Sequence, residues 1–89
     1  MKDQNFTIRD ERDVTLKGSI AYGCLHLESH IYDEDFESEL NYDFTREDTD
    51  KLFSVLSFEE FIELCKNEGL LGLDEVLKEH DIKVKSHVF

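Results

Sequence analysis

A mainly apolar set and a polar set of side chains alternate between residues 36 and 44, and this alternation constrains the fold more than any other stretch of the chain. One set of alternate positions holds Phe36, Ser38, Leu40, Tyr42 and Phe44. The other set holds Glu37, Glu39, Asn41 and Asp43. Successive side chains of a β-strand point to opposite faces of its sheet. The pattern therefore predicts a strand with one buried face and one acidic, solvated face.

A second strand is expected over residues 19–32, with Gly23 as a bulge or bend. Leu25, Leu27 and Ile31 share one face of it, and Cys24, His26, Glu28 and His30 share the other. Buried residues must lie opposite buried residues, because a slip of one residue turns every side chain over. This condition predicts five cross-strand pairs: Ile31 with Phe36, Leu27 with Leu40, Leu25 with Tyr42, His30 with Glu37, and Glu28 with Glu39.

Shorter alternations occur near both ends of the chain. Residues 5–9 and 13–17 predict a hairpin, and Lys17, Gly18 and Ser19 predict a turn after it. Residues 82–88 predict a final strand, with Lys83, Lys85 and His87 on its outward face.

Three short helices are expected between these strands. Thr45 is typical of an N-cap, so a first helix runs to about Leu56. Ser57 and Glu60 have the spacing of a capping box that begins a second helix, and Gly69 ends it. A third helix continues to about His80 on the i, i+3, i+4, i+7 pattern.

This order predicts an α+β fold: an antiparallel sheet of four to five strands, three short helices packed on one face, and a final strand at the C-terminus. Residues 1–89 are expected to form a single domain, with strands within 5–44, helices within about 46–80 and the last strand over 82–88.

The net charge of -12 is concentrated in one stretch. Residues 28–50 hold ten acidic side chains and one basic side chain, Arg46. Nucleic acids and anionic membranes are bound mainly through Lys and Arg, so direct binding to either is not expected. A basic protein is the expected partner. Two cysteines, and no apolar run typical of a signal peptide or a membrane span, favour the cytoplasm.

Metal binding and catalysis have little support in the sequence. His26, Glu28 and His30 share a strand face and suit zinc chemically, but an exposed polar face has the same spacing, and no known zinc motif accompanies them. The acids around Asp33 lack the glycine and the ligand spacing of a calcium loop. Cys24 and His26 have no third group to orient them. We therefore expect no enzymatic activity, no metal and no cofactor.

The pattern of charge predicts a small acidic inhibitor that occludes the basic nucleic-acid-binding surface of a partner protein. Phage proteins that mimic DNA to block CRISPR or restriction nucleases, and immunity proteins of nuclease toxins, work by this physics. The candidate contacts are Glu28, Asp33, Glu34, Asp35, Glu37, Glu39, Asp43, Glu47 and Asp48, with Tyr32 and Tyr42 as aromatic anchors. The first alternative is a regulatory or structural interaction module, a homodimer through a sheet edge or the helical face. The second is a metal-binding protein.

Overall fold

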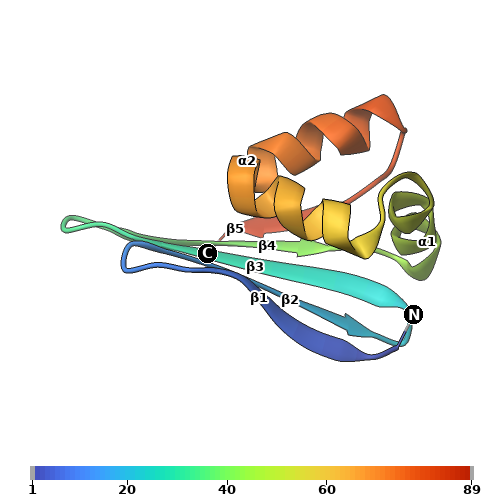
Figure 1. The fold of residues 1–89 in the computed structure, drawn as a ribbon. Helices are drawn as coiled ribbons and strands as arrows, with labels where there is room; N and C mark the ends of the chain where they lie inside the picture. Colours follow the sequence, from blue (N-terminus) through green and yellow to red (C-terminus); the bar gives the residue numbers. More distant parts are fainter. Residues whose placement is uncertain (1, 89) are drawn as a thin grey trace.

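Five strands form one antiparallel sheet in the order in which they occur in the chain (Figure 1). They are β1 (Gln4–Asp10), β2 (Val14–Ala21), β3 (Cys24–Tyr32), β4 (Glu37–Asp43) and β5 (Lys85–Val88). Two helices, α1 (Arg46–Val55) and α2 (Phe58–Glu79), lie between β4 and β5 in the chain. The computed structural model describes residues 2–88, so Met1 and Phe89 of the expected domain lie outside it. The α+β class and the C-terminal strand are confirmed.

The turn between β2 and β3 lies at Tyr22 and Gly23, not at Lys17–Ser19 as predicted. Both turn residues have positive φ, 55° and 79°, which is the conformation of a two-residue type I′ hairpin turn. Ala21 and Cys24 face each other on either side of it. The single long strand expected over residues 19–32 is therefore two strands.

Gly18 lies in the middle of β2 instead, where it leaves room for an aromatic ring. A Cβ atom on Gly18 would come within 2.3 Å of the Phe6 ring. That ring packs edge-on against Phe58, with centroids 5.1 Å apart, and against Phe61, with centroids 6.3 Å apart. The missing side chain is thus a packing requirement, which explains why the turn interpretation of this glycine was wrong.

The register of β3 with β4 differs from the prediction by two residues. Leu27 pairs with Tyr42, His30 with Glu39, and Ile31 with Ser38. The hairpin turn covers Asp33 to Phe36 and is closed by a 2.8 Å hydrogen bond from the Asp33 N–H to the Phe36 carbonyl. A slip of two residues keeps every side chain on its face. The predicted faces are therefore right, although the predicted partners are wrong.

Residues 2–88 form two helices, not three. Thr45 and Ser57 are the N-caps, and Ser57 with Glu60 forms the full capping box. At Gly69 the backbone leaves helical geometry (φ 68°, ψ −161°), but helix follows directly, so the expected second and third helices are two halves of a kinked α2. Only glycine adopts this conformation readily, which is why Gly69 bends the element.

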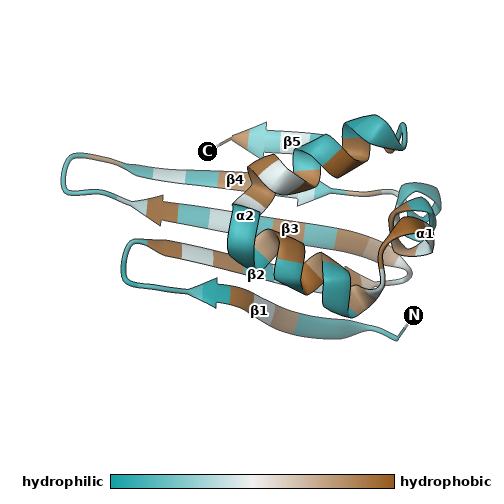
Figure 2. Cartoon of the chain, turned by 45° about the horizontal axis from the view of Figure 1, so that its top comes forward, coloured by the Kyte–Doolittle hydropathy of each residue, from teal (hydrophilic) through white to brown (hydrophobic). Residues whose placement is uncertain are grey.

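Both helices lie on the same face of the sheet (Figures 1 and 2). The largest fully buried side chains lie between the two layers: Phe61, Ile20, Leu25, Leu27, Leu52, Leu73 and Cys65. The Leu25 N–H donates to Thr49 Oγ1 at 3.0 Å and ties α1 to β3. No helix within residues 2–88 is long and apolar enough to cross a membrane.

The last strand begins at Lys85, three residues later than predicted. Ile82 is buried in the core, and the backbone N–H of Lys83 donates to Asp48 Oδ1 at 3.2 Å. These contacts belong to the connection from α2, so the apolar pattern that starts at Ile82 reflects core packing before the strand.

Candidate partner-binding surface

Two hairpin loops meet at one end of the sheet and carry a dense group of acids. In a sheet whose strands follow chain order, the β1–β2 and β3–β4 loops lie at the same end (Figure 1). The N–H of Tyr32 donates to the Asp13 carbonyl at 2.8 Å and joins them. All six acidic side chains are exposed, and together they form what we call the acidic end: Asp10, Glu11, Asp13, Asp33, Glu34 and Asp35.

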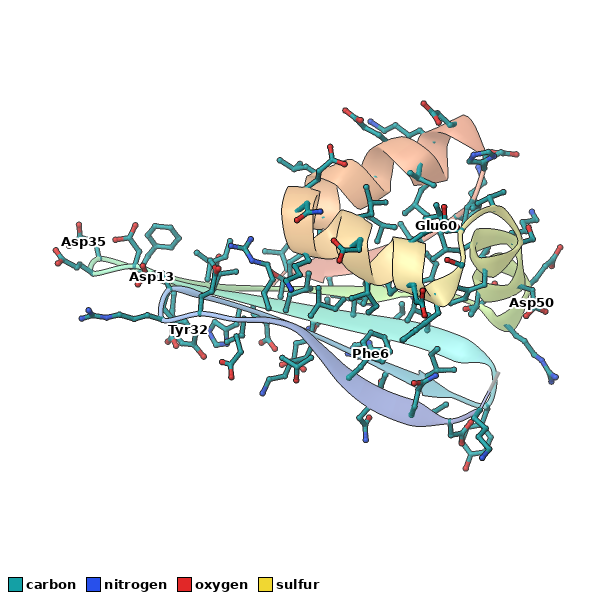
Figure 3. The ribbon with its side chains drawn as sticks, viewed as in Figure 1. Phe6, Asp13, Tyr32, Asp35, Asp50 and Glu60 are labelled. Atoms are coloured by element: carbon teal, nitrogen blue, oxygen red, sulfur yellow. The ribbon has the colours of Figure 1, made fainter. Side chains whose placement is uncertain are left out.

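Exposed aromatic side chains accompany the acidic end. Phe36, the last residue of the β3–β4 turn, is 56% exposed, and Tyr32 is 39% exposed. The Tyr32 ring stacks on the imidazole of His30 with centroids 4.2 Å apart. Figure 3 shows Asp35 at the tip of the hairpin, with Asp13 and Tyr32 close behind it. Exposed aromatic residues are enriched at protein-binding surfaces.

The sheet face away from the helices, called here the open face, holds histidines paired with acids. His26 Nδ1 lies 2.6 Å from Asp43 Oδ1, and His87 Nε2 lies 3.6 Å from the other oxygen of Asp43. His30 Nε2 lies 3.2 Å from Glu37 Oε1. Each contact is an ion pair only when its imidazole carries a proton.

Two glutamates on the open face interact with each other. Glu28 pairs in register with Asn41, and Glu39 lies diagonally across the strands from it. A hydrogen bond with Glu28 is the main reason that the pKa of Glu39 is raised, with burial and the Glu28 charge adding to it. Glu28 and Glu39 therefore interact along the diagonal and not as the direct cross-strand partners that were predicted.

The closing strand brings positive charge to one side of the open face. Lys85 is the cross-strand neighbour of Asp43, and His87 is that of Asn41. Asp43 is thus surrounded by His26, His87 and Lys85. The other acids of the open face, Glu28, Glu37 and Glu39, lie nearer the acidic end.

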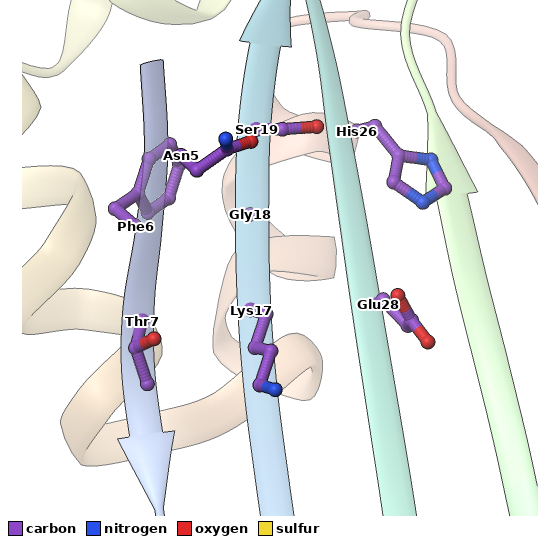
Figure 4. Close-up of a pocket in the computed structure, with 8 residues that line it drawn as sticks. All are labelled: Asn5, Phe6, Thr7, Lys17, Gly18, Ser19, His26 and Glu28. Carbon is purple, nitrogen blue, oxygen red and sulfur yellow. The ribbon is translucent and has the colours of Figure 1, made fainter.

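A shallow depression of about 420 Å³ lies on the open face over β1, β2 and β3 (Figure 4). Its polar lining includes Lys17, Ser19, His26 and Glu28. Ser19, His26 and Asp43 lie side by side on three neighbouring strands, the residue types of a catalytic triad. However, the imidazole is turned toward Asp43 and away from Ser19, so the serine and the base are not in contact (Figure 4).

The metal hypothesis rested on His26, Glu28 and His30, which do share the open face. Their imidazoles are directed to different carboxylates, Asp43 and Glu37. Within residues 2–88 no group of three or more His, Cys, Asp or Glu side chains is arranged to hold a metal ion.

The structure separates the predicted contact residues into distinct places. Asp33, Glu34 and Asp35 are in the acidic end, beside Tyr32 and Glu37, while Glu28, Glu39 and Asp43 lie farther along the open face. Glu47 and Asp48 belong to α1, which lies at the opposite end of the sheet (Figure 1).

Two of the predicted contacts are buried. Tyr42 faces the helices, and its hydroxyl donates to Asp74 on α2 at 2.8 Å. Asp48 accepts hydrogen bonds from the Thr45 hydroxyl at 2.9 Å and from the Lys83 N–H at 3.2 Å. Both side chains hold the fold together and are not accessible to a partner.

Three acids of the acidic end were not among the predicted contacts: Asp10, Glu11 and Asp13. The alternation on either side of them indicated a hairpin, and strand order places its loop beside the β3–β4 loop. Glu11 is paired with Arg9, which lies near the end of β1. Comparison with protein-family models, curated proteins and solved structures gave no significant match.

Proposed function

We propose that this protein is a small acidic inhibitor whose acidic end docks on the basic nucleic-acid-binding surface of a partner protein and keeps nucleic acid out. The observation that carries this proposal is the meeting of two hairpin loops, which puts six exposed carboxylates beside exposed Tyr32 and Phe36. Arg12 is the one basic side chain within the two loops.

Long-range attraction and short-range contacts have separate roles in this mechanism. The net charge of -12 steers the protein toward a positive groove and speeds association, an effect that salt screens. The aromatic rings then supply apolar contact, which slows dissociation. Occlusion needs no chemical step, because a domain seated in the groove excludes the nucleic acid by its volume.

This mechanism operates in two settings. Phage proteins inhibit CRISPR or restriction nucleases, and immunity proteins inhibit nuclease toxins. Both need a cytoplasmic protein that acts as a binding module without catalysis. The proposal places this chain in that functional class and leaves the identity of the nuclease to experiment.

Affinity capture tests the proposal directly. The tagged protein is incubated with lysate of its native cell at about 50 mM and about 500 mM NaCl, and bound proteins are identified by mass spectrometry. The test variant carries Asp33→Asn, Glu34→Gln and Asp35→Asn. The control carries Glu63→Gln, Glu75→Gln and Glu79→Gln on the exposed surface of α2, which changes the net charge equally.

We expect wild type and control to capture a basic nucleic-acid-binding protein at low salt, and the test variant to capture it about tenfold less well. The purified partner should then lose DNA or RNA binding when the wild-type protein is added. Equal loss in both variants, or capture of no basic protein, would refute the proposal. Light scattering that shows a stable dimer hiding the acidic end would favour the homodimer alternative.

A further inference from the structure

The helices leave part of their face of the sheet uncovered. Figures 1 and 2 show both hairpins extending well beyond α2 toward the acidic end. On this uncovered part a groove of about 400 Å³ lies between the sheet and α2. The aliphatic side chains of its lining, which define what we call the apolar groove, are Val14, Leu16, Ile31, Leu40, Leu70 and Leu71.

The apolar character of this region extends onto exposed side chains at its margin. Leu71 is 80% exposed on α2, and Val88, the register neighbour of Leu40 on β5, is 77% exposed. Adjacent exposed apolar residues around a concave lining are typical of a binding site rather than of scattered surface leucines and valines.

The kink at Gly69 shapes one wall of the groove. Helix that continued straight from Glu68 would carry the second half of α2 in a different direction, but φ 68° and ψ −161° at Gly69 turn it (Figure 1). The residues on both sides of the kink, Glu68, Leu70 and Leu71, line the groove. The groove is therefore built by a backbone conformation that glycine alone adopts readily.

The charged groups around the groove leave an excess of negative charge. Arg9, Glu68 and Asp74 are the charged residues in its lining. Arg9 is paired with Glu11. Asp74 accepts a hydrogen bond from the neutral Tyr42 hydroxyl, which leaves its charge uncompensated. Val14 and Ile31 pair across β2 and β3 at one end of the groove, and this end borders the acidic end, since Asp13 precedes Val14 and the β3–β4 turn begins at Asp33.

We propose that the apolar groove binds an amphipathic helix of a partner protein, with apolar side chains in the groove and Lys or Arg side chains facing Glu68, Asp74 and the acidic end. This inference rests on the proposed function, because it names the element of the basic partner that is bound. A helix fits because the uncovered sheet face continues the face that α2 covers, and helix on sheet is the packing the fold already uses. Self-association is disfavoured by the charge of -12 on each chain.

The test uses a designed probe and matched variants. The probe is a fluorescein-labelled peptide of about 18 residues, long enough to form a helix, with leucines on one helical face and lysines on the other. The control peptide has the same composition in scrambled order. Leu71→Ser removes apolar surface at the groove without disturbing the core, and Val55→Ser makes a similar change on α1.

Fluorescence anisotropy should give a Kd for the amphipathic peptide that rises about fivefold to tenfold in Leu71→Ser and stays unchanged in Val55→Ser. In ¹⁵N-labelled protein, the peptide should shift the amide signals of Val14, Ile31, Leu40 and Leu71. The scrambled peptide should bind more weakly and leave these four signals in place.

Equal binding of both peptides, with shifts confined to residues 33–35, would overturn the groove proposal and leave the acidic inhibitor standing. The opposite result is that the peptide shifts the groove signals and the acidic-end substitutions do not weaken capture of the cellular partner. It would overturn the inhibitor proposal and leave the groove proposal standing. Sedimentation that shows a dimer abolished by Leu71→Ser would make the occupant a second copy and overturn the proposal.

Discussion

The Tyr42 hydroxyl lies 2.8 Å from Asp74 Oδ1 and 3.1 Å from Oδ2, and this contact ties β4 to the half of α2 that follows the kink. Tyr42→Phe keeps the buried ring and removes only the donor. We expect the free energy of unfolding to fall by about 1–2 kcal/mol, because a hydrogen bond to a charged acceptor is lost. Urea denaturation at neutral pH measures this.

The same contact predicts a pH dependence. Burial first, and then Asp74, raises the pKa of Tyr42 from 10.0 to about 12. The folded state therefore holds this proton more tightly than the unfolded chain, and the stabilisation present below pH 10 is lost as the pH rises to about 12. The stability difference between wild type and Tyr42→Phe should shrink across this range. A difference that stays constant from pH 9 to pH 12 would contradict it.

Asp48 predicts a stability effect that a surface acid would not have. Asp48→Asn replaces a buried carboxylate that accepts from the Thr45 hydroxyl and the Lys83 N–H. We expect a loss of about 1–3 kcal/mol in the free energy of unfolding. The control is Glu47→Gln, an exposed acid in the same first turn of α1, which removes the same charge. If the two variants unfold at the same urea concentration, the structural role assigned to Asp48 is incorrect.

Gly69→Ala tests the kink in α2. A Cβ at this position meets no atom within 4 Å, so the cost comes from the backbone conformation alone. We expect a loss of about 1–3 kcal/mol in the free energy of unfolding. Glu75→Ala, at an exposed position in the same helix, should cost nothing measurable. Unchanged stability in Gly69→Ala would mean that α2 keeps its bend without a glycine.

Glu28→Gln should lower the pKa of Glu39 toward its ordinary value of 4.5, because the hydrogen bond and the charge that raise it are both changed. A ¹³C NMR titration of the Glu39 carboxyl measures this directly, and Glu34→Gln in the hairpin turn serves as control. In the wild type the pair disfavours folding while both groups are ionised, and the penalty is relieved as the pH falls toward the raised pKa. An unchanged titration curve in Glu28→Gln would show that another group perturbs Glu39.

Much of the fold could be predicted because period-2 alternation decides which side chains share a face. The assignment of Leu25 and Leu27 to the buried face and of His26 and Glu28 to the open face is confirmed. The register could not be predicted, because a slip of two residues preserves every face. Gly18, Gly23 and Gly69 could not be distinguished by composition: one makes room for a ring, one completes a turn and one bends a helix.

The predicted contact residues likewise include some whose positions could be predicted from the sequence and some whose positions could not. The acids at 33–35 are exposed in a turn, as their place between the two expected strands indicated. Asp10, Glu11 and Asp13 join them only through the order of the strands, which no local pattern contains. The sequence did contain a signal that Tyr42 is buried, since it shares alternate positions with Leu40 and Phe44. That signal is stronger than the aromatic character that made Tyr42 a candidate anchor.

The acidic end stands on two hairpin turns that contribute no side chain to the buried core. Substitutions, insertions or charge reversals in these turns can therefore accumulate while the layers of sheet and helix keep their stability. Related chains can therefore change their target through substitutions in two short loops. When a target mutates to escape binding, the inhibitor can adapt in these loops while its fold stays the same.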